Sequence, residues 1–175
     1  MRALRTRGYV WWTAALVLAI FSQAGSAELP TVTGADIPQF GIYEARVLAT
    51  DKSAGPPSGT IDRVAWQFTP STTTVPARKG IRFGYEYRLT GEPDGALVPV
   101  RSITIFPPGG MRNPRTGEVF SRSDVTERWA IGSTVLHGYS LDDDWEAVPG
   151  TWVLQTWVGE QKVAEMEFTL ARSAN

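Results

Sequence analysis

The stretch from Leu141 to Leu170 reads LDDDWEAVPGTWVLQTWVGEQKVAEMEFTL and decides the fold class of this chain. Its residues Thr151–Val158 and Val163–Leu170 are rich in the β-branched and aromatic side chains that favour strands. Between them, Gly159–Lys162 (GEQK) has the composition of a hairpin turn, and Val148-Pro149-Gly150 provides a corner before the first segment. The stretch therefore predicts two adjacent antiparallel strands.

The same kind of pattern recurs toward the amino terminus. In Ile81–Leu89 (IRFGYEYRL), apolar residues occupy every second position, which is the period of a half-buried strand. Further strands are expected at Phe40–Thr50, Ile61–Thr69, Leu97–Phe106 and Thr134–Leu141. Helical periodicity with caps is not found in any long window. We therefore predict an immunoglobulin-like antiparallel β-sandwich of about seven or eight strands over residues 40–171, preceded by a linker at residues 28–39.

Residues 1–27 have the three parts of a secretory signal peptide. Three arginines make the first ten residues basic, Val10–Phe21 is almost wholly apolar, and small residues follow up to Ala27. The apolar run is shorter than the ~20 residues that a membrane-spanning helix needs. We therefore expect cleavage after Ala27, no stable membrane anchor after cleavage, and a periplasmic or secreted location.

The composition excludes several classes of site and partner. The chain has no cysteine, so disulfides, thiolate catalysis and cysteine-ligated metals are ruled out. All 18 acidic residues follow residue 27, whereas three of the 17 basic residues precede it, so residues 28–175 carry a net charge of −4. This mild acidity argues against nucleic-acid binding, which usually needs a surface with concentrated lysine and arginine. No phosphate-binding or other cofactor motif is present, and we expect no cofactor.

The densest group of carboxylates is Asp142–Asp144. Calcium prefers such oxygen ligands, but the run lacks the ligand spacing and the glycine of an EF-hand loop. We therefore interpret it as a solvated bend before a strand, with cation binding as the less favoured alternative, and predict no metal site.

His137 is the single histidine and lies within the expected strand Thr134–Leu141. A lone histidine in a strand is more often a packed, hydrogen-bonded residue than a general base. A triad of His137 with Ser133 or Ser140 lacks a nucleophile elbow, and neighbouring strand residues point to opposite faces. We predict no catalytic residues, and a hydrolase is the lesser alternative.

The loop Pro107–Glu118 (PPGGMRNPRTGE) is the best candidate for an interaction site outside the core. It carries Arg112 and Arg115, and exposed loops commonly hold binding residues. Its Asn-Pro and Thr-Gly pairs predict a turn inside a wide hairpin, and its spacing matches no phosphate-binding loop.

Tryptophans are the other candidates for a binding surface. Alternation places Trp152 with Leu154 on one face of their strand and Trp157 on the other. If Trp152 faces the core, Trp157 lies on the outer surface. Trp157 and Trp145 are therefore the aromatic residues that we expect to contact a partner or to form platforms for sugar rings.

Several motifs in sequence order resemble a family of small exported bacterial proteins that is known only as a domain of unknown function. The motifs are Gly41-Ile42-Tyr43-Glu44-Ala45, Val75–Gly80 with Phe83-Gly84, Pro107-Pro108, Asn113-Pro114 with Thr116-Gly117, and a WExVPGxW corner from Trp145 to Trp152. The resemblance covers about residues 40–170 and implies an exported β-sandwich. It implies no activity.

These observations predict a non-catalytic binding module of the bacterial cell envelope, whose partner is another envelope protein or a glycan. The candidate contact residues are Arg112, Arg115, Trp145 and Trp157. The main alternative is a glycan-binding module that uses the exposed tryptophans.

Overall fold

The computed structural model describes residues 29–52, 60–69 and 71–172. The expected signal peptide, residues 1–27, lies outside this part of the chain. Within it, no helix has the length and apolar character needed to cross a membrane.

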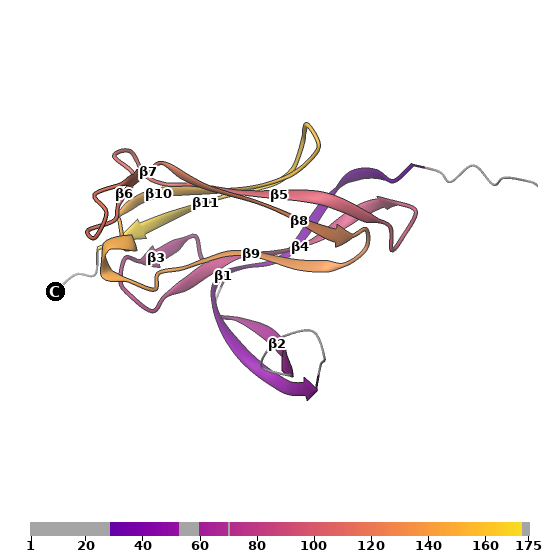
Figure 1. The fold of residues 1–175 in the computed structure, drawn as a ribbon, viewed down its shortest axis with the longest axis horizontal. Coiled ribbons are helices and arrows are strands. Elements are labelled where there is room, and N and C mark those ends of the chain that lie inside the picture. The colour runs from indigo at the N-terminus through magenta and orange to yellow at the C-terminus, as the bar shows by residue number, and fades with distance from the viewer. Residues whose placement is uncertain (1–28, 53–59, 70, 173–175) are drawn as a thin grey trace, which may run out of the picture.

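The described residues form two facing β-sheets (Figure 1). The four-stranded sheet has the order β2-β1-β4-β9, with β1 at Thr31–Lys52, β2 at Thr60–Thr69, β4 at Arg82–Glu92 and β9 at Thr134–Ser140. The five-stranded sheet has the order β3-β11-β10-β5-β8, with β3 at Thr74–Pro76, β5 at Leu97–Ile105, β8 at Arg122–Ala130, β10 at Gly150–Val158 and β11 at Gln161–Ala171. Neighbouring strands are antiparallel except β3 and β11, which are parallel. A predicted all-β sandwich is therefore confirmed.

The core lies between the sheets and is dominated by aromatic rings. Trp152 of β10 is fully buried, as its alternation predicts, and its ring packs edge-on against Phe83 of β4 at a centroid distance of 5.6 Å. Phe106 and Tyr139 also contact Trp152, at 4.9 and 5.0 Å. The indole Nε1 of Trp152 donates to the Val148 carbonyl oxygen at 3.0 Å, so its one polar group is satisfied.

The hairpin predicted at Gly159–Lys162 is present, because β10 and β11 pair through the turn at Gly159-Glu160. Gly91–Ala96 (GEPDGA), whose composition also predicts a hairpin turn, does not form one. It leads from β4 in the four-stranded sheet to β5 in the five-stranded sheet. The Gly- and Arg-rich loop also contains its expected wide hairpin, made by β6 (Met111–Arg112) and β7 (Val119–Phe120).

Three strand segments were not expected from the sequence: the first half of β1, the short β3 and the edge strand β8. Residues 31–39, predicted as part of a linker, form the first half of β1 and pair with β4 from Thr31 opposite Glu92. Irregularities in register at Gly34 and before Gln39 break the alternation there, which hides the strand. Strand β8 was missed because it is a sheet edge whose residues are mostly exposed on both faces, so it lacks an apolar period.

A row of glycines lies on the outer face of the four-stranded sheet, and one aromatic ring packs closely on it. Gly41, Gly84 and Gly138 are register partners on three neighbouring strands. The ring of Tyr43 packs so closely on Gly138 that a Cβ there would lie 2.6 Å from the Tyr43 hydroxyl oxygen. Because Tyr43 lies in the first part of β1 that pairs with β2, opposite Phe68, this contact holds the β1–β2 hairpin, which projects from the sandwich (Figure 1).

The substitution Gly138→Ala tests this packing. The new methyl group has to displace the Tyr43 ring, so we expect a loss of roughly 1–3 kcal/mol in the free energy of unfolding, measured by denaturant titration. Amide hydrogen exchange should rise in the β1–β2 hairpin. Gly34→Ala is the matched control, since its Cβ meets its nearest neighbour at an ordinary 3.6 Å. Equal losses in the two variants would contradict this packing.

Candidate functional site

A groove runs between two unpaired strand edges of the sandwich. Strand β8 ends the five-stranded sheet and β9 ends the four-stranded sheet. Two hollows lie between these strands, with volumes of about 190 and 230 Å³. Both are lined by Ser123 of β8 and Tyr139 of β9, so they lie next to each other, and we call the two hollows together the edge groove.

The first hollow is the polar end of the edge groove. It is lined by Ser102, Thr104, Ser123, Val125 and Glu127 from β5 and β8, and by residues 136–139 of β9. At its base, His137 is buried. Val125 is 52% exposed, because an edge strand has no neighbour to cover it.

His137 is held by hydroxyl groups from both sheets. Its Nδ1 lies 3.2 Å from the hydroxyl of Tyr85 and 3.1 Å from that of Thr156, and its Nε2 lies 3.3 Å from that of Thr104. Burial lowers the pKa of the imidazole to about 4, so the ring is neutral at physiological pH. His137 therefore contributes a neutral, hydrogen-bonded ring to the polar end of the groove, as expected for a packed, structural histidine.

The serines considered for a catalytic triad make hydrogen bonds elsewhere. Ser133 donates to the Ala130 carbonyl oxygen at 2.6 Å, and Ser140 accepts from Arg82 at 3.1 Å. In the described residues, neither serine is a hydrogen-bond partner of His137, whose contacts are the three hydroxyls named above.

Tyr87 contributes a buried hydroxyl group without a partner. Its side chain is fully buried, and its oxygen has no hydrogen-bond partner within the described part of the chain. Burial raises the pKa of the phenol, and the nearby Glu127 carboxylate raises it further. The hydroxyl of Tyr85, by contrast, has a hydrogen-bond partner, because it lies 2.7 Å from the hydroxyl oxygen of Thr156.

The second hollow is the apolar end of the edge groove. It is lined by Phe106, Met111, Phe120, Arg122, Ser123, Tyr139 and Trp145. Trp145 is half-buried and comes from the 3₁₀ turn η1 (Asp144–Glu146). Its indole Nε1 donates to Asp143 at 3.3 Å, which orients the ring beside the hollow.

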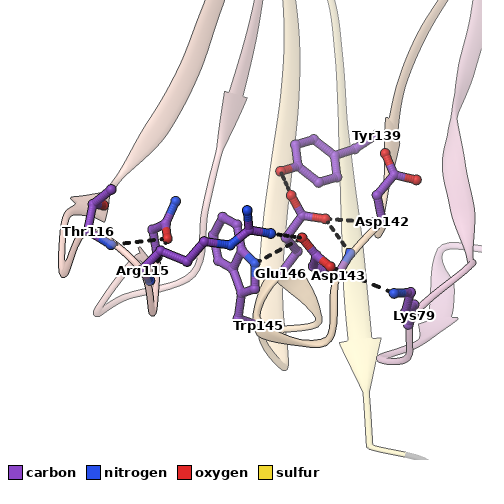
Figure 2. A network of polar contacts seen from close by, with 9 residues as sticks. Lys79, Arg115, Thr116, Tyr139, Asp142, Asp143, Trp145 and Glu146 are labelled. Atoms are coloured by element: carbon purple, nitrogen blue, oxygen red, sulfur yellow. Dashed lines mark hydrogen bonds and ion pairs between the residues drawn. The ribbon is translucent and has the colours of Figure 1, made fainter.

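The acidic run before η1 is used to build this turn (Figure 2). One carboxylate oxygen of Glu146 accepts from the backbone N–H groups of Asp142 and Asp143, at 2.6 and 2.9 Å. The other lies 3.4 Å from the Tyr139 hydroxyl, which donates to it. Among the described residues, no group of three or more His, Cys, Asp or Glu side chains is arranged to hold a metal ion. The geometry supports a capped bend at Asp142–Asp144.

Asp143 brings together two of the predicted contact residues. Arg115 approaches its carboxylate at 4.0 Å and Lys79 approaches it at 3.7 Å from the other side, while Trp145 donates to it (Figure 2). The arginine and lysine side chains are largely exposed, so these ion pairs are weak in water. Arg115 is therefore available beside the apolar end of the groove.

The other two predicted contact residues lie apart from this cluster. Arg112 donates to the Gly117 carbonyl oxygen at 2.9 Å and so supports its own hairpin. Trp157 is half-buried on the outer face of the five-stranded sheet, where its indole donates to Gln155 at 3.1 Å. Sequence reasoning missed the β8 side of the groove, including Ser123 and Glu127. No apolar alternation marks this strand, since Ser123 and Glu127 share a face with Val125 and Trp129.

Comparison with known proteins agrees with this architecture. The model of the family described as Domain of unknown function (DUF3859) matches residues 32–170. The chain belongs to the DUF3859 family. This confirms the resemblance seen in the sequence, and the match begins within β1, before the predicted domain boundary.

The DUF3859 domain is also similar to a solved structure. The crystal structure of an immunoglobulin-like protein from Pseudomonas aeruginosa matches with 24% sequence identity and a TM-score of 0.59, covering 84% of this chain and 100% of that chain. This likeness confirms the immunoglobulin-like fold. No curated protein matches the chain significantly.

Two tyrosines that differ in hydrogen bonding provide a matched test of the polar end. Tyr85→Phe leaves Thr156 and His137 without a shared partner, so we expect the free energy of unfolding to fall by roughly 1–3 kcal/mol. Tyr87→Phe removes a hydroxyl that has no partner, so stability should be unchanged or higher. Denaturant titration of both variants measures the difference. A larger loss for Tyr87→Phe than for Tyr85→Phe would contradict the described network.

The buried imidazole couples stability to pH. The unfolded chain, with an ordinary histidine pKa of 6.5, binds a proton more readily than the folded chain, in which that pKa is about 4. We expect this contribution to be complete above pH 6.5 and to decline as the pH falls to about 4, by roughly 3 kcal/mol at about 1.4 kcal/mol per pH unit. Denaturant titrations across this range measure it. His137→Gln should lack this part of the slope, and an identical slope would disprove the coupling.

Proposed function

We propose that this protein is a non-catalytic binding module of the bacterial cell envelope and that it contacts its partner through the edge groove. The observation that carries the proposal is the edge groove, whose two adjoining hollows share Ser123 of β8 and Tyr139 of β9, with a polar end at His137 and an apolar end at Trp145. Concave surfaces that combine apolar rings with a few convergent polar groups are typical binding sites. The signal-peptide pattern of residues 1–27 supports an envelope location.

The groove favours a protein partner over a glycan. Trp145 and Trp157, the expected sugar platforms, are both half-buried. Trp145 lines the groove, whereas Trp157 lies on the outer face of the five-stranded sheet with Gln155. The two rings therefore do not form one flat surface. An unpaired strand edge beside an apolar hollow suits a polypeptide, which offers both backbone groups and side chains.

Photo-crosslinking in the bacterium that encodes the protein tests this proposal. A benzoylphenylalanine at Val125, which is exposed inside the groove, should yield discrete adducts with a partner protein. The same residue at Glu167, exposed on β11, should not yield them.

Equal adducts at the two positions, or none at Val125, would contradict binding through the groove. Cell fractionation of the same strain should find a mature chain that begins at Glu28 in the envelope or the medium. Retention of the full chain in the cytoplasm would contradict the proposed compartment.

A further inference from the structure

The four strands at the sheet edges differ in how they are protected against pairing with another chain. Natural edge strands are kept from such pairing by charges, proline, irregular register or short length. Strand β3 has three residues and ends in Pro76, β2 contains Asp62 and Arg63, and four of the nine residues of β8 are charged. Among the four edge strands that the structure describes in the two facing sheets, β9 (TVLHGYS) alone has neither a charged residue nor a proline.

Strand β9 is also a regular template. Its seven residues pair with β4 from Arg82 opposite Ser140 to Arg88 opposite Thr134, without a shift in register. Its other side has no strand partner in the described residues, because β9 ends its sheet. A regular and uncharged edge of this length leaves backbone N–H and C=O groups free to pair with an added strand.

We propose that β9 accepts an extended segment of the partner protein as an additional strand. This inference rests on the proposed binding function and specifies how the groove is used. Side chains alternate between the faces of a sheet, so every second residue of an added strand would point into the edge groove. The positions of the two hollows along β9 suit this period. His137 lines only the polar hollow, and Tyr139, two residues further along β9, lines both hollows.

The linings of the hollows define the chemistry of the segment. The hollow beside Trp145 has the rings of Phe106 and Phe120 in its wall, and its volume of about 230 Å³ accepts a large apolar side chain. In the polar hollow, Glu127 has an exposed carboxylate that forms no ion pair within the described part of the chain. The segment therefore carries an apolar or aromatic residue and, two positions away, a lysine or arginine.

A second copy of this chain does not fit this description. If two β9 strands paired with each other, the side chains next to the groove would be those of Val135, His137 and Tyr139. In each copy these side chains are already packed inward: Val135 and His137 are buried, and Tyr139 lies 5.0 Å from Trp152. They are not free to fill the hollows of a partner, so the geometry points to a different polypeptide.

The test uses peptides whose backbone donors are removed selectively. Nine-residue peptides are selected from a phage-display library on the exported protein, and the best binder is synthesised in two N-methylated forms. N-methylation of the residues whose N–H groups face β9 should weaken binding about tenfold or more, since each substitution removes a backbone hydrogen bond. N-methylation of the intervening residues should leave the affinity within about twofold. Equal effects would overturn strand addition.

Glu127→Gln examines the proposed charge pairing. Because Glu127 is exposed, the substitution should lower the affinity for a peptide with lysine at the predicted position by about three- to tenfold. The effect should vanish when that lysine is replaced by glutamine, and Glu167→Gln is the matched control on β11. A peptide that binds with no apolar-x-basic pattern, or without dependence on Glu127, would overturn the proposed segment chemistry.

The outcomes separate this inference from the proposed function. If adducts form at Val125 but N-methylation at either set of positions leaves the peptide affinity unchanged, the groove is retained as a binding site and strand addition is rejected. Absence of adducts at Val125 would reject groove binding itself. A concentration-dependent dimer with protected β9 amides would show that a second copy covers the edge, and it would overturn the proposed partner.

Discussion

The packing of Trp152 against rings from both sheets is the interaction on which the rest of the sandwich depends. Its ring contacts Phe83 of β4 and Tyr139 of β9, which belong to the opposite sheet, and Phe106, which follows β5. Such edge-on aromatic contacts add specific geometry to the burial of apolar surface. Because Tyr139 is fixed in this cluster and also lines both hollows of the edge groove, core packing determines where the groove lies.

The polar end of the groove depends on a second constraint, which is that buried polar groups need hydrogen-bond partners. A histidine between two sheets is stable when hydroxyls satisfy its ring nitrogens, and Tyr85, Thr104 and Thr156 provide them. These three residues come from both sheets, so the network also links the sheets beside the groove. The edge groove is thus bounded by an aromatic cluster on one side and a hydrogen-bonded cluster on the other.

Sequence patterns predicted the central strands well because at least one face of each strand is covered by the rest of the protein. Ile81–Leu89 and the β10–β11 hairpin alternate clearly, and Trp152 was placed in the core on that basis. The same logic failed at β8, where an edge position permits polar residues on either face. Trp145 and Arg115 were recognised as candidates by residue type, but their meeting at Asp143 depends on tertiary contacts between η1 and the β6–β7 loop. The groove itself requires two strands from different sheets, and no local pattern encodes that juxtaposition.

The Tyr43 ring on its row of glycines has a consequence for cooperativity. Beyond Tyr43, the β1–β2 hairpin pairs with itself alone, and its Trp66 and Phe68 rings pack on Tyr43, both at 5.6 Å. Local units joined to a domain by few contacts open with a smaller free energy than the whole domain. The hairpin therefore forms its own unfolding unit, and release of this one ring would detach it while the two-sheet core stays intact.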